Sequence, residues 1–189
     1  MHPRPLSGLR VLDLTRVLAG PYCTLLLADL GADVVKVERP ETGDDARSFG
    51  PFLENGHSAY FASINRGKKS IALDLKDDAD RATFLQLVTR ADILVENYRA
   101  GTMLKLGLDS ESLRKHNPRL IYASLSGFGQ SGSDTDRAAY DIVVQALSGL
   151  MSITGAGPGQ SVRVGTSISD ILTGIFGAVA IVSAVHGRT

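Results

Sequence analysis

One acidic residue, Asp170, stands at the edge of a long apolar run. The small residues Gly165, Thr166, Ser167 and Ser169 precede it, and residues 171–185 contain no charged side chain. The small residues favour a tight turn, and the apolar run favours a buried core helix. A carboxylate at the start of such a helix meets free N–H groups and the positive end of the helix dipole. Two roles fit this placement: a helix N-cap, or a reactive carboxylate that attacks an electrophile at the mouth of a pocket.

Strand-like and helix-like segments alternate along the chain. The fold that they form determines where Asp170 lies. The alternation predicts an α/β fold with a Rossmann-like, mostly parallel sheet flanked by helices, and ligands bind beyond the carboxyl ends of strands in such sheets. Residues 39–65 are rich in Gly, Pro and polar residues, which predicts a long loop of the kind that is often functional. The predicted strands cover residues 11–14, 34–38, 70–75, 93–95 and 120–125, and the predicted helices cover residues 22–30, 77–89, 102–106, 110–115, 140–151 and 171–185.

Composition narrows the function class. The 189 residues are enough for one sizeable core, and 43% of them are hydrophobic. Lys plus Arg equals Asp plus Glu at 20 each, so we expect no nucleic-acid binding and no polybasic membrane surface. The apolar run at 171–185 is short for a bilayer span and contains Gly174 and Gly177, and residues 1–5 lack the apolar core of a signal peptide. His, Cys and acidic residues show no ligand spacing, so no metal site is expected.

The single cysteine, Cys23, cannot form an internal disulfide. A lone free cysteine suits a reducing compartment, so we expect a cytoplasmic protein. A buried, small hydrophobic role is the favoured interpretation of this side chain.

Cationic, amide and aromatic side chains follow the predicted strands. Arg39 comes after residues 34–38 and could reach a phosphate through charge-assisted hydrogen bonds, or lie as a surface arginine. Asn97, Tyr98 and Arg99 come after residues 93–95, where Tyr98 could stack on a base or pack in the core. The densest basic cluster, at residues 66–69, could bind phosphates or form a solvated loop.

An ordered set of segments resembles the class III coenzyme A transferases. This family includes formyl-CoA transferase, carnitine CoA-transferase, succinate-dependent acyl-CoA transferases and the related α-methylacyl-CoA racemases. The resemblance runs from about Leu6 to the end of the chain. Each motif alone is weak, but the ordered set is specific. The matching segments are Thr15-Arg16-Val17-Leu18-Ala19-Gly20-Pro21, Glu38-Arg39-Pro40, Asn65-Arg66-Gly67-Lys68-Lys69-Ser70, Glu96-Asn97-Tyr98-Arg99-Ala100-Gly101, Ala139-Tyr140-Asp141 and Ser169-Asp170.

The resemblance implies an acyl-CoA:carboxylate CoA-transferase in which Asp170 is the nucleophile. Coenzyme A would be a substrate rather than a prosthetic group, with succinyl-CoA as a reasonable donor and a carboxylic acid as acceptor. Backbone N–H groups around Ser169 could stabilise the developing oxyanions. Some relatives carry a lysine where this chain has Ala138, and the adjacent Arg137 could substitute for it. The coenzyme-binding positions implied are Leu18, Ala19, Arg39, Leu73, Asp74, Leu75, Lys76, Asn97, Tyr98, Arg99, Lys105, Arg137 and Tyr140.

Family members are about twice as long as this chain. Residues 1–189 are therefore expected to form the N-terminal part of the large domain, with the small domain and the C-terminal part lying outside the chain. The resemblance further implies an interlocked homodimer for the complete protein.

Two other functions stay open. An α-methylacyl-CoA racemase needs a base at the α carbon, and in that branch a histidine precedes the shared tyrosine. Residues 133–139 contain no histidine, which favours a transferase over a racemase. A half-length chain could also bind CoA without turnover. The four histidines, His2, His57, His116 and His186, fall elsewhere and are interpreted as ordinary surface residues.

Overall fold

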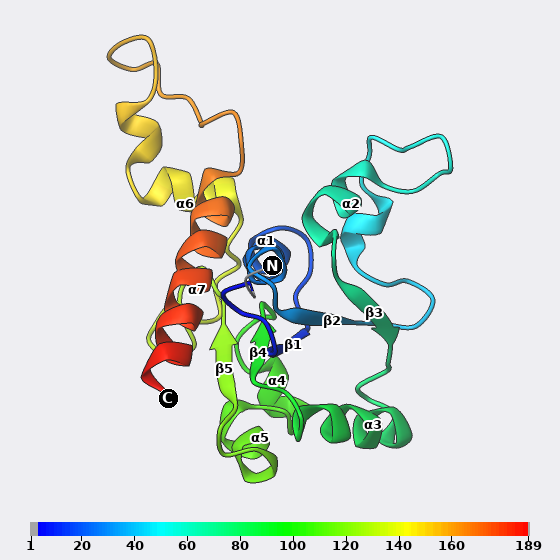
Figure 1. Cartoon of the computed structure of the whole chain (residues 1–189). Helices are drawn as coiled ribbons and strands as arrows, with labels where there is room; N and C mark the ends of the chain where they lie inside the picture. Colours follow the sequence, from blue (N-terminus) through cyan, green and yellow to red (C-terminus); the bar gives the residue numbers. More distant parts are fainter. Residues whose placement is uncertain (1–3, 189) are drawn as a thin grey trace.

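The computed structural model describes residues 4–188, so residues 1–3 of the N-terminal segment, with His2, lie outside it. Five parallel strands form one sheet in the order β3-β2-β1-β4-β5 (Figure 1). This order reverses direction between β1 and β4, which makes their carboxyl ends the expected ligand site. The predicted parallel α/β sheet is confirmed. The strands are β1 (Arg10–Asp13), β2 (Asp33–Glu38), β3 (Lys69–Ala72), β4 (Ile93–Glu96) and β5 (Ile121–Ser124).

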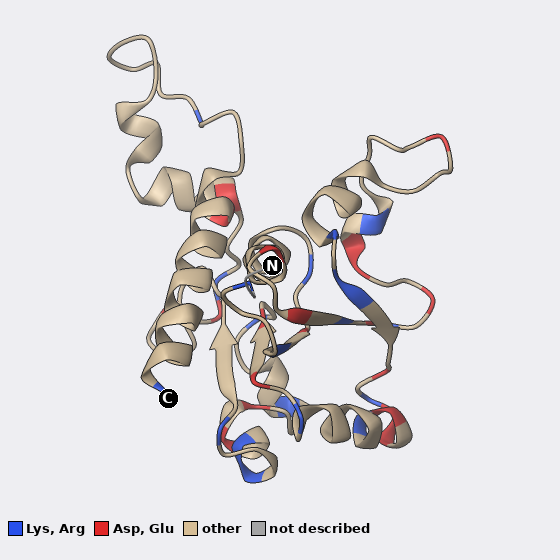
Figure 2. Cartoon of the chain, in the orientation of Figure 1, with Lys and Arg blue, Asp and Glu red and all other residues tan. Residues whose placement is uncertain are grey.

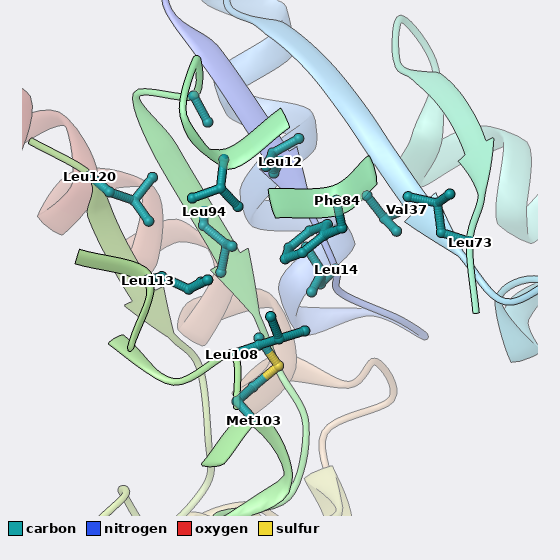
Figure 3. Packing of buried hydrophobic residues seen from close by; sticks show 12 residues of the cluster. Leu12, Leu14, Val37, Leu73, Phe84, Leu94, Met103, Leu108, Leu113 and Leu120 are labelled. Atoms are coloured by element: carbon teal, nitrogen blue, oxygen red, sulfur yellow. The ribbon is translucent and has the colours of Figure 1, made fainter. Parts of the chain in front are cut away.

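Alternating side chains of the central strands face two separate hydrophobic layers. On β1, Val11 packs beneath α1 (Ala19–Asp29) and α7 (Ile168–Gly187), whereas Leu12 belongs to the opposite layer with Phe84 (Figure 3). That opposite layer is covered by α3 (Asp78–Val88), α4 (Thr102–Lys105) and α5 (Ser110–His116). Strands buried on both faces read as continuous apolar runs, which is why they were visible in the sequence.

Helices α1 and α7 pack closely through Gly174. A Cβ built on Gly174 would lie 2.8 Å from the carbonyl oxygen of Ala19, so a larger residue there would push the helices apart. Ala178 and Ile181 continue the same buried stripe. Because Asp170 lies about one helical turn before Gly174, this contact fixes the start of α7 beside the start of α1.

The predicted loop at 39–65 is wrong in part, because it contains two helices. The short 3-10 helix η1 (Asp45–Ser48) begins after Asp44, whose side chain accepts the N–H of Ala46. Helix α2 (Ala59–Asn65) begins after Ser58, whose hydroxyl accepts the N–H of Phe61. These N-caps hold elements too short to show a clear apolar period.

Two predicted elements end earlier than expected. Strand β3 stops at Ala72, so Leu73, Asp74 and Leu75 leave the sheet. The helix predicted at 140–151 ends at Leu147 as α6 (Asp141–Leu147), and the 3-10 helix η2 (Leu150–Ile153) follows. Gly149 separates the two with a φ of 80°, a left-handed conformation that interrupts a helix.

The prediction that α7 is a buried core helix is only half right. Its inner face packs along α1, but Leu172, Phe176 and Val179 are exposed. By length and composition α7 could cross a membrane: its most apolar window has a mean hydropathy of 2.0, and 17% of that window is buried. Buried core helices satisfy the same criteria. Figure 2 shows few charges on α6, α7 and the segment between them, in contrast to β2, α3 and α5.

Candidate active site

A pocket of about 290 Å³ lies at the carboxyl ends of β2 and β4. Arg39, Tyr98 and Arg99 line it, as do the residues that leave β3 early. Most of the predicted coenzyme-binding residues are therefore gathered around one cavity. The complete lining is Arg16, Val37, Glu38, Arg39, Leu73, Asp74, Leu75, Lys76, Tyr98, Arg99, Thr102 and Leu106.

Two arginines of this pocket are held by one acid. Asp45 pairs with Arg16 and with Arg39, each at 3.1 Å, and both guanidinium groups remain partly exposed. The Arg16 guanidinium lies 5.9 Å from the ring centre of Tyr98. Burial raises the pKa of the Tyr98 phenol, and the charges of Arg16 and Arg39 oppose that rise. The pocket thus combines an aromatic face with cations that remain able to meet an anionic ligand.

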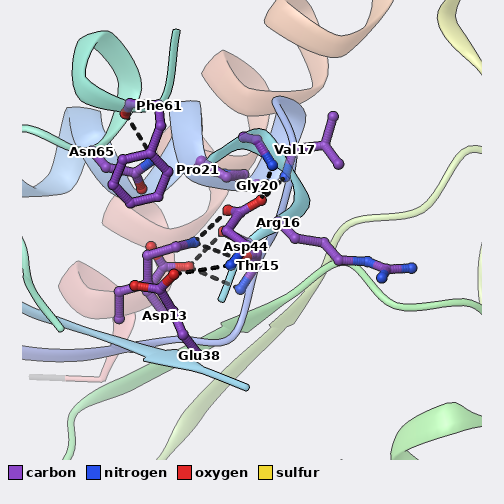
Figure 4. Close-up of polar contacts among 12 residues, drawn as sticks. Asp13, Thr15, Arg16, Val17, Gly20, Pro21, Glu38, Asp44, Phe61 and Asn65 are labelled. Atoms are coloured by element: carbon purple, nitrogen blue, oxygen red, sulfur yellow. Dashed lines mark hydrogen bonds and ion pairs between the residues drawn. The ribbon is translucent and has the colours of Figure 1, made fainter. Parts of the chain in front are cut away.

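The loop after β1 is clamped by Asn97 on one side and by Asp44 on the other, and Figure 4 shows the contact with Asp44. Asn97, beyond β4, accepts the N–H of Arg16 at 2.9 Å and donates to its carbonyl at 2.8 Å. Asp44 accepts the N–H of Val17 at 3.0 Å. Val17 is β-branched and has a φ of 68°, a conformation that costs energy and persists only where the surroundings hold it. Asn97 was predicted to bind the coenzyme, but its amide is committed to this loop.

A buried ionic network underlies the clamp. Lys36 lies 2.9 Å from Asp44 Oδ2 and donates to the carbonyl of Thr15 at 2.6 Å. Asp44 Oδ2 has no hydrogen-bond donor of good geometry among the described residues, so the Lys36 charge is its compensation. Lys68 lies 3.0 Å from Asp13, and both side chains are almost fully buried. Burial alone would raise the pKa of Asp13, but the charges of Lys68 and Lys36 and two hydroxyl donors lower it.

The cations of the basic cluster at residues 66–69 point to three different acids. Arg66 pairs with Asp29, Lys68 points inward to Asp13, and Lys69 pairs with Asp33. Lys68 and Lys69 are consecutive where the chain enters β3, so their side chains point to opposite sides. The cations of the cluster therefore do not converge on one site: Lys68 is buried, whereas Arg66 and Lys69 are exposed and paired with different acids.

Asp170 lies in the first turn of α7 and is half-buried. The helix N-cap is Ser167, so the interpretation of Asp170 as the N-cap is wrong. Burial raises the pKa of Asp170, and the nearby carboxylate of Asp141 raises it further. A carboxylate with a raised pKa is a stronger base and nucleophile, provided it is still ionised at the working pH.

A family model for CoA-transferase family III matches residues 6–189. The chain belongs to CoA-transferase family III. The succinyl-CoA:mesaconate CoA-transferase of Haloarcula hispanica is 53% identical over 191 residues, covering 97% of this chain and 48% of that protein. The acetyl-CoA:oxalate CoA-transferase of Acetobacter aceti is 52% identical over 185 residues, covering 97% of this chain and 47% of that protein. A crystal structure of a CAIB/BAIF family protein from Brucella suis matches with a TM-score of 0.93 and 44% identity, covering 99% of this chain and 50% of that one.

These similarities confirm the predicted family and fold. The chain spans about half the length of the curated family III relatives that it matches. Activity, substrates and assembly are properties of the whole protein, and they are taken up below as proposals.

The backbone N–H of Ser169, an expected oxyanion donor, is already engaged within the protein. It already donates to Asp141 Oδ1 at 2.8 Å, so it is unavailable to an oxyanion while this bond holds. Asp141 instead caps the start of α7 from the neighbouring helix, because Ser167 makes no side-chain cap to any described residue.

Sequence reasoning missed Tyr60 on α2. Burial raises the pKa of its phenol, and the charges of Asp170 and Asp44 add to that rise. The charge of Asp170 therefore acts on the Tyr60 phenol. Tyr60 was hidden because residues 39–65 were interpreted as one loop.

Several predicted binding residues lie away from the pocket lining. Leu18 and Ala19 begin α1, directly after the clamped loop. Lys105 is exposed on α4. Arg137 pairs with Asp134 at 3.4 Å and covers the ring of Phe128, and Tyr140 is 66% exposed.

Cys23 is buried, and its pKa is raised to about 12 by burial and by the charge of Asp13. It therefore fits the small hydrophobic role expected of it. Within residues 4–188, no group of three or more His, Cys, Asp or Glu side chains is placed to hold a metal ion.

Proposed function

We propose that the protein containing this chain is an acyl-CoA:carboxylate CoA-transferase with Asp170 as its nucleophile. The observation that carries the proposal is the position of Asp170 at the start of α7, half-buried and beside a second carboxylate that raises its pKa. Family membership and the names of relatives about 50% identical to the chain support CoA transfer as the reaction.

The proposed reaction passes through two mixed anhydrides and one thioester, all formed on Asp170. The Asp170 carboxylate attacks the thioester carbonyl of the donor. The C–S bond breaks, CoA departs as the thiolate, and a mixed anhydride between Asp170 and the donor acid remains. The thiolate then attacks the aspartyl carbonyl, which releases the donor acid and leaves an aspartyl–CoA thioester. The acceptor carboxylate attacks this thioester and expels the thiolate. Attack of the thiolate on the acceptor carbonyl of the second anhydride gives the new acyl-CoA and restores Asp170.

The 290 Å³ pocket would bind the nucleotide end of coenzyme A. Tyr98 offers an aromatic face, and Arg39 and Arg99 offer charged donors for phosphates. Asp45 already holds Arg16 and Arg39 side by side, which reduces the entropy lost when both bind an anion. Coenzyme A acts here as a substrate, and the proposal needs no prosthetic group.

Succinyl-CoA is the proposed donor, because two relatives, from Haloarcula hispanica and Agrobacterium fabrum, carry succinyl-CoA or succinate in their names. The acceptor is a carboxylic acid. We further propose a cytoplasmic homodimer. The exposed apolar side chains of α7 supply a surface that a soluble protein normally covers.

Isotope exchange tests the function. The protein is incubated with succinyl-CoA and ¹⁴C-succinate, and label entering the thioester is measured. Transfer predicts label exchange that is abolished in Asp170→Ala. Binding of CoA without any exchange would favour an inactive binding protein. Wash-in of solvent deuterium at the α carbon of a 2-methylacyl-CoA without exchange would favour a racemase.

A further inference from the structure

Gln145 is the least expected polar residue near the start of α7. It lies on α6, its side chain is fully buried, and its amide bonds both to its own helix and to the segment that leads into α7. An amide is costly to bury unless its donors and acceptor are satisfied. An apolar residue would fill the same space at lower cost, so the hydrogen bonds are what the position provides.

The contacts of Gln145 lie around the start of α7. Its Nε2 donates to Asp141 Oδ2 at 2.6 Å and reaches the carbonyl of Thr166 at 3.5 Å. Its Oε1 accepts the N–H of Val164 at 2.8 Å. Val164 and Thr166 belong to the segment that leads into α7, so one side chain joins this segment to α6.

Asp141 connects Gln145 to the first turn of α7. With Oδ2 engaged by Gln145, its Oδ1 accepts the N–H of Ser169 at 2.8 Å, the residue directly before Asp170. A carboxylate bonded at both oxygens has one orientation, whereas a carboxylate bonded at one oxygen can rotate. We infer that Gln145 is a positioning residue: by holding Asp141 and the segment before α7, it fixes the orientation of Asp170 for attack on the thioester. This inference rests on the proposed transferase function.

The substitution Gln145→Glu tests the donor while keeping the shape. The introduced carboxylate still accepts the N–H of Val164, but its second oxygen would face Asp141 Oδ2 at the position of the lost N–H. Two carboxylates at that separation share one proton, so one of them binds it up to a higher pH than usual. The shared proton remakes the hydrogen bond at low pH, and its loss at higher pH breaks the bond. The other charged groups on the elements that meet here are Asp170 on α7 and Arg163 in the preceding segment.

The measurement is kcat and KM of the variant and of the unaltered protein from pH 5 to pH 8. We expect the ratio of variant to unaltered kcat to be near one at the acid end and to fall at least about tenfold toward pH 8, while KM for succinyl-CoA changes little. A ratio that does not depend on pH would overturn the inference. Gln86→Glu, an exposed change on α3 in the opposite layer, is the matched control and should leave the ratio flat.

A second variant separates positioning from folding. Gln145→Met removes the donor and acceptor without adding charge, and it should lower kcat at every pH, with KM little changed. If Gln145→Met fails to fold, the isosteric Gln145→Glu at low pH carries the test, with circular dichroism recording the fold at each pH. Wild-type kcat in a folded Gln145→Met would overturn the inference alone. Absence of label exchange in the unaltered protein would overturn the proposed function instead.

Discussion

Asp44 accepts the backbone N–H of Val17 at 3.0 Å, and Val17 has a φ of 68°. The acid comes from the segment after β2 and the valine from the loop after β1, so the bond joins two strand ends at the pocket. The buried Lys36 forms an ion pair with Asp44. A buried ion pair thus holds a backbone conformation that valine would not adopt by itself.

Substitutions at Val17 should reveal that strain. We expect Val17→Gly to be more stable than Val17→Ala by about 1 kcal/mol, because glycine adopts positive φ without penalty. At an ordinary position the order is reversed, since glycine loses more entropy on folding. Urea unfolding of both variants measures the difference. An alanine variant as stable as the glycine variant would show that the loop relaxes to negative φ.

Glu38 makes the stability of the fold depend on pH. Burial alone would raise its pKa, but hydrogen bonds from Arg47, Ser70 and the Asp44 N–H lower it to about 2. A lowered pKa stabilises the folded state above the unfolded value of 4.5, and this contribution fades as the pH falls toward 2.

We therefore expect Glu38→Gln to lose up to about 3 kcal/mol of unfolding free energy at pH 7, with the deficit shrinking below about pH 4. Denaturant unfolding at several pH values measures it. Glu54→Gln, on an exposed glutamate, is the control. A deficit that is equal at pH 7 and pH 3 would contradict the role of the Glu38 charge.

Ionisation of Asp170 should have the opposite effect on stability: it should destabilise the folded state. Burial and Asp141 raise its pKa, so its ionised form destabilises the folded state at pH values above the folded pKa. Asp170→Asn removes that charge, and we expect a higher Tm at neutral pH together with complete loss of label exchange. The gain in Tm should vanish in acid, where Asp170 is protonated in the unaltered protein as well.

A matched control is Asp78→Asn, in the first turn of α3, where an exposed acid pairs with Arg81 and meets the positive end of the helix dipole. This change should lower the Tm or leave it unchanged. A lower Tm for Asp170→Asn as well would mean that the helix dipole outweighs burial at the start of α7.

Two arginine variants, one inside the pocket and one outside it, should separate coenzyme binding from surface charge. Arg39→Met is expected to raise KM for acyl-CoA about tenfold with little change in kcat, since a charge-assisted hydrogen bond contributes about 1.5 kcal/mol or more. Arg66→Met removes the same charge from a residue paired with Asp29 outside the pocket, and KM should stay within about twofold. An equal rise in KM for both variants would point to the overall field of the protein instead of the pocket.

The sequence was most informative where one physical signal dominated. A continuous apolar run marked the central strand β4, which is buried on both faces, whereas alternation of apolar and polar residues marked the more exposed β3. The strand ends drew attention to Arg39, Tyr98 and Arg99, and all three line the pocket. The neighbours of Asp170 on α6 could not be identified in this way, because the bonds of Gln145 join residues 19 to 21 positions apart in the chain.

Local sequence patterns gave wrong expectations for charged residues whose ion-pair partners lie far away in the chain. Lys68 looked like a phosphate ligand in a basic run, yet it is buried against Asp13, 55 residues away. Nothing in the local pattern distinguishes a lysine that serves a ligand from one that neutralises a buried acid. The segment containing Tyr60 was missed for a different reason: α2 has only seven residues, and its N-cap, Ser58, stands in a stretch dominated by turn formers.

The most direct test is intact-mass spectrometry of the protein after incubation with succinyl-CoA, followed by peptide mapping. If Asp170 is the nucleophile, a coenzyme-sized adduct will map to the peptide containing Asp170 and will be absent in Asp170→Ala. An adduct on another residue, or active label exchange that persists in Asp170→Ala, would contradict the assignment of Asp170.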